Sequence, residues 1–335
     1  MIHQSFLLRD TVQFAARDSV LILNSALDPF VQRALLDIKG GTLTLAEDNV
    51  AAAATALSSS VKKSAARHVA FHDYILHHPA GTMDIAVMNL LYQPGNAWIL
   101  HGLQVALYAL RPGGRLYVAG AKDRGILSTA KRMREYFGNV EALQISKGQR
   151  VVCSHKRNEQ HAPIQIQDVT VFADSKLDEG TRLLLEALEV RVTDEALDIG
   201  SGAGFIGLYI ARLATQGHVT MVDVSLAAVD AAQRAVEQSG LTNVLVLPGD
   251  GVQAVSKQRF DLVATNPPFH HGGIQTMEIA ERFIRDAAQV LRPLGRFYMV
   301  ANRFLKYEPT LHAAFKQVEE VGGDTRYKVL RAVNG

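Results

Sequence analysis

Short apolar runs alternate with stretches of helical periodicity along the whole chain. In the first half the apolar runs predict strands at 19–23, 42–46, 69–71, 84–88 and 115–119, with helices over 28–37, 49–58 and 102–110. In the second half they predict strands at 169–172, 194–199, 218–222, 244–247, 261–265, 296–301 and 326–332, with helices over 182–188, 205–214, 226–238 and 278–291. Strands that alternate with helices build parallel sheets covered on both faces. The pattern therefore predicts an α/β chain with two doubly wound sheets.

The two halves are in register with each other. Segments 22–26 and 44–47 match 198–202 and 220–223 at an offset of 176 residues, and 84–89 matches 261–266 at an offset of 177. A repeat of this length indicates two copies of one domain, although one fold reached twice without duplication is the alternative. The polar, proline-containing stretch 156–168 is typical of a linker. We therefore predict one domain over 1–155 and another over 169–335.

The composition is ordinary for a globular protein, with 335 residues, 48% of them hydrophobic and 20% charged. No apolar stretch reaches the roughly 18 residues of a transmembrane helix, and the first ten residues lack the basic start of a signal peptide. Cys153 is the only cysteine, so an intrachain disulfide is excluded, and no Cys/His cluster has zinc spacing. We expect a cytoplasmic protein that has no membrane span and binds no metal.

Basic residues are concentrated in the first half. Residues 1–160 hold 18 Lys and Arg against 12 Asp and Glu, whereas residues 161–335 hold 17 against 21. Lys131, Arg132 and Arg134 stand close together in the basic half. Such asymmetry is typical of a domain that docks on nucleic acid, although a mixed, solvated surface gives the same counts.

A glycine-rich turn follows an early strand of the second half. It reads Asp198-Ile-Gly200-Ser-Gly202-Ala-Gly204, and glycines let a ligand approach the backbone at a helix start. The turn alone is a weak signal, because dinucleotide-binding folds share it. Asp223 ends the next strand, where a carboxylate can accept both ribose hydroxyls, and Asp250 follows the strand after that, placed to meet an adenine amine. Together these residues predict a cofactor that contains adenosine.

The strand 262–265 runs directly into Asn266-Pro267-Pro268-Phe269. Proline has no N–H and restricts the residue before it, so the strand stops with Asn266 at its end. The Asn266 side-chain oxygen and the Pro267 carbonyl can accept the two hydrogens of an amine on a planar ring, and Phe269 can stack on that ring. A stiff turn explains the four residues equally well when they are considered alone.

The first copy supplies a comparison within the chain. It keeps Glu47 and Asn89 but has Leu-Leu-Tyr after Asn89 and no glycine within 22–26. The prolines and glycines are thus present together in one copy and absent together in the other. This coupling favours a catalytic role for Asn266, and it indicates that the first copy has lost cofactor binding and catalysis.

From about residue 165 onward the sequence resembles class I S-adenosylmethionine-dependent methyltransferases, which have a Rossmann-like fold. The likeness is to the bacterial ribosomal RNA small-subunit guanine-N2 methyltransferases, with a large-subunit relative close behind. Besides the motifs above it rests on Leu177-Asp-Glu-Gly-Thr181 and Val300-Ala-Asn302-Arg-Phe-Leu305. The loop at His271-Gly272-Gly273 is longer than the family pattern, which leaves the exact target open. In the first half the resemblance is limited to the order of the predicted strands and helices.

The resemblance implies S-adenosylmethionine as the cofactor and the N2 amine of a guanine in ribosomal RNA, free or in a ribosomal subunit, as the target. The implied cofactor-binding residues are Asp198, Gly200, Gly202, Gly204, Asp223 and Asp250, with Asp178 and Thr181 closing over the cofactor. The implied catalytic residues are Asn266 and Pro267, which hold the amine, and Phe269, which stacks on the base. We expect a monomer whose basic first half contacts RNA.

Three other functions remain open from the sequence. The same chemistry could act on adenine N6, cytosine N4 or a protein glutamine amide. Both copies could instead be non-catalytic binding modules in ribosome assembly, against which the intact glycines and Asn-Pro-Pro-Phe count. A nicotinamide oxidoreductase would explain the glycine turn but not Asn-Pro-Pro-Phe.

Overall fold

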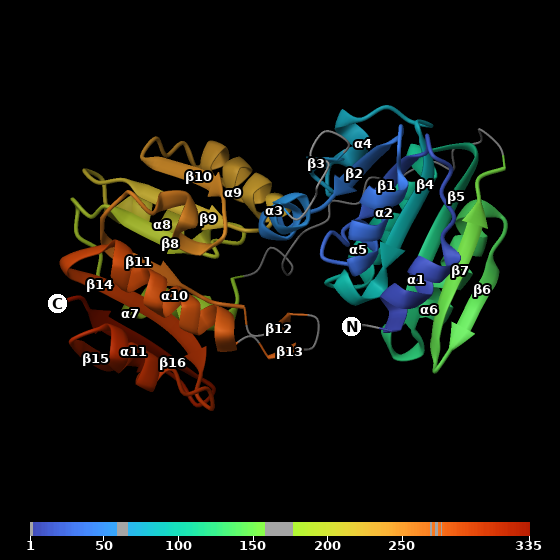
Figure 1. Cartoon of the computed structure of the whole chain (residues 1–335). Coiled ribbons are helices and arrows are strands. Elements are labelled where there is room, and N and C mark those ends of the chain that lie inside the picture. Colours follow the sequence, from blue (N-terminus) through green and yellow to red (C-terminus); the bar gives the residue numbers. More distant parts are fainter. Residues whose placement is uncertain (1–2, 59–65, 158–176, 269, 272–273, 276) are drawn as a thin grey trace. The chain divides into compact units, whose positions relative to one another are not determined.

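The computed structural model describes residues 3–58, 66–157, 177–268, 270–271, 274–275 and 277–335 (Figure 1). The chain divides into two compact units, 1–169 and 170–335. Each unit is built on one seven-stranded sheet. The strand predicted at 169–172 and all but two residues of the predicted linker lie outside the described residues.

The first unit follows the predicted alternation of strands and helices. Its strands are β1 (Ser19–Leu23), β2 (Thr42–Ala46), β3 (Ala66–Val69), β4 (Met83–Asn89), β5 (Leu110–Ala121), β6 (Glu141–Ser146) and β7 (Gln149–His155). Its helices are α1 (His3–Thr11), α2 (Pro29–Asp37), α3 (Val50–Ser58), α4 (Tyr74–His77), α5 (Asn96–Ala109) and α6 (Ile126–Phe137), with 3₁₀ turns η1 (Leu90–Tyr92) and η2 (Lys122–Arg124). The spatial strand order is β3-β2-β1-β4-β5-β7-β6.

The second unit repeats this plan. Its strands are β8 (Ala196–Ile199), β9 (Val219–Asp223), β10 (Val244–Pro248), β11 (Phe260–Thr265), β14 (Leu291–Asn302), β15 (Gln317–Gly323) and β16 (Tyr327–Val333), and a separate pair is formed by β12 (His270–His271) and β13 (Ile274–Gln275). Its helices are α7 (Glu179–Ala187), α8 (Phe205–Leu213), α9 (Leu226–Ser239), α10 (Met277–Val290) and α11 (Glu308–Ala314), with the 3₁₀ turn η3 (Gly251–Val255).

The two sheets have the same topology, which confirms the prediction of two tandem doubly wound sheets. The second sheet runs β10-β9-β8-β11-β14-β16-β15, strand for strand the order of the first. One expectation is corrected: the sheets are mixed, because the last two strands of each pair antiparallel with their neighbours. The two hairpins add strands β6, β7 and β15, which the apolar pattern did not predict.

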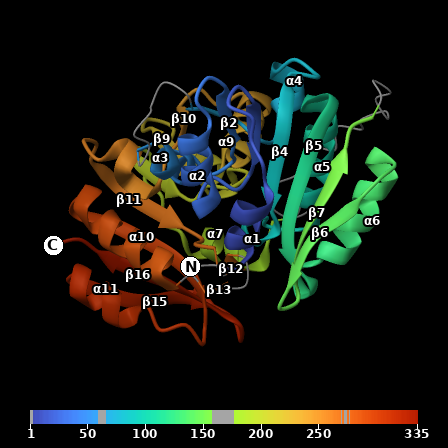
Figure 2. The same cartoon turned by 45° about the vertical axis from the view of Figure 1, so that its right-hand side comes forward.

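Helices cover both faces of each sheet (Figure 2). In the second unit α10 and α11 pack over the face that carries Val263, whereas α7, α8 and α9 pack over the face that carries Leu262. Neighbouring residues of a strand point to opposite faces of the sheet. Because helices cover both faces, the side chains on both are buried and must be apolar. This explains why the strands are continuous apolar runs. No described helix is long and apolar enough to cross a membrane.

Candidate active site

The predicted site residues of the second unit meet where the strand order reverses. On one side of β8 lie β9 and β10, and on its other side lie β11 and β14. Asp198 of β8 pairs with Ala264 of β11, so Gly200 and Asn266, each two residues further on, emerge at the same edge. Open α/β sheets bind ligands at such a switch point. Thr265, which the sequence did not single out, joins the two strand ends by donating from its hydroxyl to the Ile199 carbonyl over 2.7 Å.

The glycine turn between β8 and α8 adopts a backbone that other residues rarely reach. Gly200, Gly202 and Gly204 have φ of 71°, 53° and 88°, in the left-handed region. A Cβ at Gly204 would lie 3.2 Å from the Met221 sulfur, whereas one at Gly202 would meet nothing within 4 Å. A side chain at Gly204 would therefore need a strained backbone and a small shift of Met221, whereas the Gly202 position leaves open space beside the turn.

Asp198 is a buried carboxylate with a spare oxygen. The residue has no exposed surface, and its Oδ2 accepts a hydrogen bond from the Gly207 N–H over 2.9 Å. Its Oδ1 accepts none from any residue that the structure describes. Burial raises the pKa of Asp198 to about 7, the Gly207 N–H opposes this shift, and the Asp223 charge adds to it. An unmatched buried acceptor of this kind fits a ligand that brings a positive charge or an N–H.

Replacing Asp198 by asparagine is expected to change the pH dependence of unfolding. The pKa of this carboxyl is raised from 3.8 to about 7 in the folded protein. Its favourable contribution to stability is therefore present below pH 3.8 and is lost as the pH rises through 7. Urea unfolding of the ligand-free protein should show wild type losing stability relative to Asp198→Asn across this range. If the difference in unfolding free energy between wild type and Asp198→Asn does not vary with pH, Asp198 does not have a raised pKa.

Asp223 holds the glycine turn at the end of β9. Its Oδ2 accepts from the Gly202 N–H over 2.8 Å, and its Oδ1 accepts from the Ser225 N–H over 2.9 Å. The Ser225 hydroxyl caps α9 by accepting from the Ala228 N–H. The carboxylate is thus fixed at the turn by two backbone N–H groups, and a carboxylate oxygen can accept more than one hydrogen bond.

Asp250 has a partner that the sequence did not predict. Arg282, in the first half of α10, donates to both oxygens of the Asp250 carboxylate, with Nη1 at 2.6 Å from Oδ2. The next residue, Phe283, lies beside both turns, since its ring is 3.4 Å from a Cβ placed at Gly200 and 3.6 Å from one placed at Gly251. Arg282 fixes the Asp250 carboxylate and Phe283 forms an apolar wall between the turns. Only the position of α10 in the chain, after β11 and the segment 266–269, could have pointed to Arg282 and Phe283.

Asp178, Thr181 and Asn266 form one hydrogen-bonded cluster. Asp178 caps α7 by accepting from the Thr181 N–H over 3.0 Å. The Asn266 amide donates to the Thr181 hydroxyl over 2.8 Å and to both Asp178 oxygens at 3.3 Å. Since a carboxylate only accepts, it orients the amide with its NH₂ group inward. The structure therefore places Asp178 and Thr181 against Asn266, in addition to the cofactor role that the resemblance implies.

The orientation of the Asn266 amide leaves its oxygen unmatched. Asn266 Oδ1 is buried and accepts no hydrogen bond from the described part of the chain. A buried acceptor without a donor costs roughly 1–3 kcal/mol, so its persistence suggests that a ligand supplies the donor. Pro267 follows directly and is buried. Phe269, the third predicted catalytic residue, lies outside the described residues.

The corresponding edge of the first sheet has the same framework, but its own side chains occupy it. Glu47 Oε2 accepts from the Ala26 N–H over 2.8 Å, as Asp223 accepts from Gly202. The Gln93 amide donates to the carbonyls of Leu23 and Asn24, and also to that of Asn89. The Leu23 and Asn24 carbonyls lie where the glycine turn begins in the second copy, and the Asn89 carbonyl lies where Asn266 stands. A ligand at this edge would have to displace Gln93.

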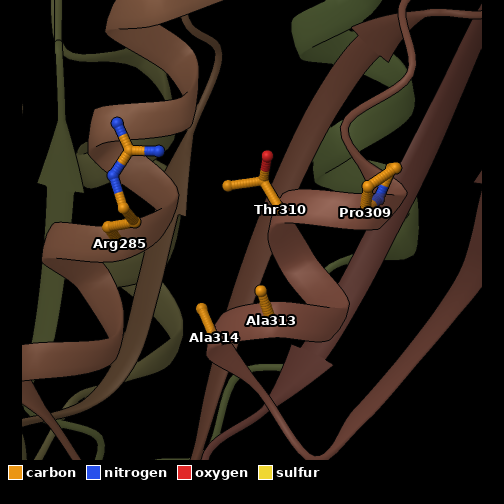
Figure 3. A pocket seen from close by; sticks show the side chains of 5 residues that line it. All are labelled: Arg285, Pro309, Thr310, Ala313 and Ala314. Carbon is orange, nitrogen blue, oxygen red and sulfur yellow. The ribbon is translucent and has the colours of Figure 1, made fainter.

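One other candidate feature lies apart from this site. A pocket of about 360 Å³ between α10 and α11 is lined by Arg285, Pro309, Thr310, Ala313 and Ala314 (Figure 3). None of these is a predicted site residue. Among the described residues no group of three or more His, Cys, Asp or Glu side chains could hold a metal ion.

Comparison with known proteins identifies relatives of the whole chain and of its second half. The family model "Methyltransferase small domain" matches residues 164–331. The chain is 31% identical to the ribosomal RNA small subunit methyltransferase C of Pseudomonas entomophila over 278 residues, which is 77% of this chain and 83% of that protein. The protein of the same name from Shewanella sediminis is 29% identical over 305 residues, covering 82% and 88%.

A solved structure matches both units together. It is the T. thermophilus 16S rRNA N2 G1207 methyltransferase (RsmC) in complex with AdoMet and guanosine. It is 30% identical, with a TM-score of 0.81, and the match covers 99% of this chain and 91% of that one.

Proposed function

The chain belongs to the ribosomal RNA small subunit methyltransferase C family, and on that premise we propose that it methylates the exocyclic N2 amine of a guanine in 16S ribosomal RNA. The methyl donor is S-adenosylmethionine, which the T. thermophilus relative binds. That relative acts at G1207, and we propose the equivalent nucleotide as the target. The observation that carries the proposal is the buried, unmatched Asn266 Oδ1 at the end of β11.

The described residues fit S-adenosylmethionine. The glycine turn would border its methionine part, with the unmatched Asp198 Oδ1 as an acceptor for the positively charged amine. Asp223, fixed by Gly202 and Ser225, would accept from the ribose hydroxyls. Asp250, held by Arg282, would accept from the adenine amine. When bound, this cofactor supplies a methyl group activated by the positive sulfur to which it is attached.

The residues around Asn266 would make a poor nucleophile reactive. The lone pair of an exocyclic guanine amine is delocalised into the ring. Asn266 Oδ1 and the Pro267 carbonyl accept its two hydrogens, which favours a pyramidal nitrogen and aims the lone pair at the methyl group. Asp178 and Thr181 keep the Asn266 oxygen in this orientation. Most of the rate then comes from positioning and electrostatics, and after the transfer the surplus proton on the nitrogen passes to water.

The guanine must leave its stack, or be unpaired already, to reach Asn266. We propose that Phe269 stacks on it and replaces part of the lost stacking, worth roughly 1–3 kcal/mol.

Transfer of a labelled methyl group tests this proposal. The protein is incubated with labelled S-adenosylmethionine and, in parallel, with 16S ribosomal RNA, small subunits, large subunits, transfer RNA and unmodified total protein. We expect label in the 16S RNA, free or in small subunits, and in no other fraction. Label in protein or transfer RNA would point to a different target amine.

We propose that the first unit binds RNA and no cofactor. Gln93 already donates to the turn carbonyls that a cofactor would meet. Lys131, Arg132 and Arg134 are exposed on α6, and Arg132 pairs with Glu135 at the surface. The Lys122 N–H donates to the Gly148 carbonyl, which brings the turns around Lys122 and Lys147 together. Such side chains contact phosphates and position RNA without distinguishing its sequence.

Charge reversal tests this role of α6. Changing Lys131, Arg132 and Arg134 together to glutamate should weaken binding of 16S RNA and lower the slope of log affinity against log salt by roughly two to three. Reversal of the exposed Lys257, Arg259 and Lys316 in the second unit is the matched control. Equal losses in both variants would show that overall charge, and not the α6 surface, determines binding.

We further propose that the enzyme acts as a monomer in the cytoplasm, where ribosomal subunits are made. All the contacts described for the site lie within the second unit, so no second copy of the chain is needed to build it. Light scattering of the protein with and without RNA measures the oligomeric state.

A further inference from the structure

Each copy of the domain has an asparagine at the end of the same strand, but the two asparagine side chains form different hydrogen bonds. Asn89 ends β4, and its amide donates to Asp28 Oδ2 over 2.6 Å. Its oxygen accepts from the backbone N–H of Leu91, two residues on, over 3.0 Å. This is an Asx turn, the usual local bond of an asparagine side chain. The Asn89 oxygen is therefore already engaged.

Asn266 occupies the matching position at the end of β11. Its amide is engaged like that of Asn89, with a carboxylate, Asp178, among its acceptors. Its oxygen, however, accepts nothing from the described residues. The residue two positions on is Pro268, which has no N–H to donate. The local bond that engages the Asn89 oxygen thus cannot form in the second copy.

We infer that Pro268 is a positioning residue, which keeps the Asn266 oxygen available for the substrate amine by removing the N–H that would otherwise bind it. The inference rests on the proposed function, because that function gives the oxygen its substrate. It assigns a separate task to each proline. The Pro267 carbonyl accepts a hydrogen from the substrate amine, whereas Pro268 has no N–H that could bind the Asn266 oxygen.

A need for a rigid turn after the strand does not by itself explain why residue 268 is a proline. Asn89 has φ of −109° and ψ of 122° with leucines after it, so this strand end reaches the extended conformation without proline. The first copy also shows that its strand ends at the asparagine when the next residue can donate a hydrogen bond. Leu91 and Pro268 both stand two residues after the asparagine. Only the proline lacks a backbone N–H that could bind the asparagine oxygen.

The experiment compares two full-length variants that differ in one atom group. Pro268→Ala restores a backbone N–H. Its matched control carries lactate at position 268, introduced by suppression of a stop codon, so that an ester oxygen replaces that N–H while the methyl side chain stays the same. Both variants lack the proline ring. The ester also makes the Pro267 carbonyl a weaker acceptor, which can only lower the kcat of the lactate variant, so a lower kcat in Pro268→Ala reports the added donor.

We expect the Pro268→Ala structure to show the new N–H bonded to Asn266 Oδ1, as Leu91 is bonded to Asn89. We expect its kcat for methylation of 16S RNA to fall roughly tenfold relative to the lactate variant, since one hydrogen bond must be broken before the amine binds. The dissociation constant of S-adenosylmethionine should be the same in both. Absence of this bond in the Pro268→Ala structure, or a kcat of Pro268→Ala equal to that of wild type, would overturn the inference.

The structural readout separates this inference from the proposed function. If wild type methylates no RNA, the proposed function fails, and the crystal structures still decide whether an N–H at position 268 captures the Asn266 oxygen. If wild type methylates 16S RNA but Pro268→Ala lacks this bond or keeps the wild-type kcat, only the role of Pro268 is wrong.

Discussion

Replacing Asn266 by alanine is expected to lower kcat for methyl transfer by roughly two to three orders of magnitude, the loss typical when one preorganised hydrogen-bonding group leaves an active site. The Asn266 oxygen would bind the amine most strongly as the nitrogen becomes pyramidal, so the loss should appear in kcat. Asp198, Asp223 and Asp250, the proposed acceptors for the amine, ribose and adenine of the cofactor, lie in or just after other strands and have no described hydrogen bond to Asn266. The dissociation constant of S-adenosylmethionine should therefore change little, which calorimetry can measure.

Asn89→Ala is the matched control, because it removes the same side chain at the same place in the first copy. Asn89 is fully buried and bonds Asp28, so we expect this variant to lose stability and to keep its kcat at temperatures where it is folded. A normal kcat in Asn266→Ala, or equal losses of kcat in both variants, would contradict the role given to Asn266.

The second large effect is expected from Asp223→Ala. The carboxylate would bind the ribose hydroxyls, and it also accepts from the Gly202 N–H that shapes the turn. Hydrogen bonds to a charged group are worth roughly 1.5–3 kcal/mol, so the dissociation constant of S-adenosylmethionine should rise roughly 10- to 100-fold. Asp223→Asn should lose less, because its amide oxygen still accepts one bond. Equilibrium dialysis with labelled cofactor measures these constants.

Glu47→Ala removes the corresponding carboxylate of the first copy, where Glu47 accepts from the Ala26 N–H. We expect no change in cofactor binding from this substitution, because Gln93 occupies that edge of the first sheet. A rise in the dissociation constant for Glu47→Ala equal to that for Asp223→Ala would mean that the first copy also binds cofactor.

The duplication could be predicted because both copies keep their strand-end residues at nearly constant spacing. Glu47 and Asp223, or Asn89 and Asn266, are recognisable pairs, and the shared strand order confirms the fold that they indicated. The hairpin strands were harder to predict. Strand β6 is an edge strand with mostly exposed, mixed residues, and it lacks the continuous apolar run of a central strand. Helix α1 was also hard to predict, because its apolar residues Leu7 and Leu8 are buried by packing against the hydrophobic core of the first unit and not by a pattern within the helix.

Side chains that meet at the candidate site could be predicted from the sequence where they follow a strand end, and less so where their hydrogen-bond partners come from distant elements. The Asn266 contact with Thr181 joins residues 85 positions apart, and the Arg282 contact with Asp250 joins residues 32 apart. Neither spacing follows a helical or strand period. Pairing of this kind depends on how α7 and α10 pack on the sheet, which hydrophobic patterning does not specify residue by residue.

The most direct test of the central claim is the identity of the methylated nucleoside. 16S RNA from cells that lack this activity is treated with the protein and S-adenosylmethionine, digested to nucleosides and analysed by mass spectrometry. We expect N2-methylguanosine at a single position, equivalent to the G1207 target of the T. thermophilus relative, formed roughly 100- to 1,000-fold more slowly by Asn266→Ala. Methylation on adenine N6 or cytosine N4, or N2-methylguanosine formed equally well by Asn266→Ala, would contradict this claim.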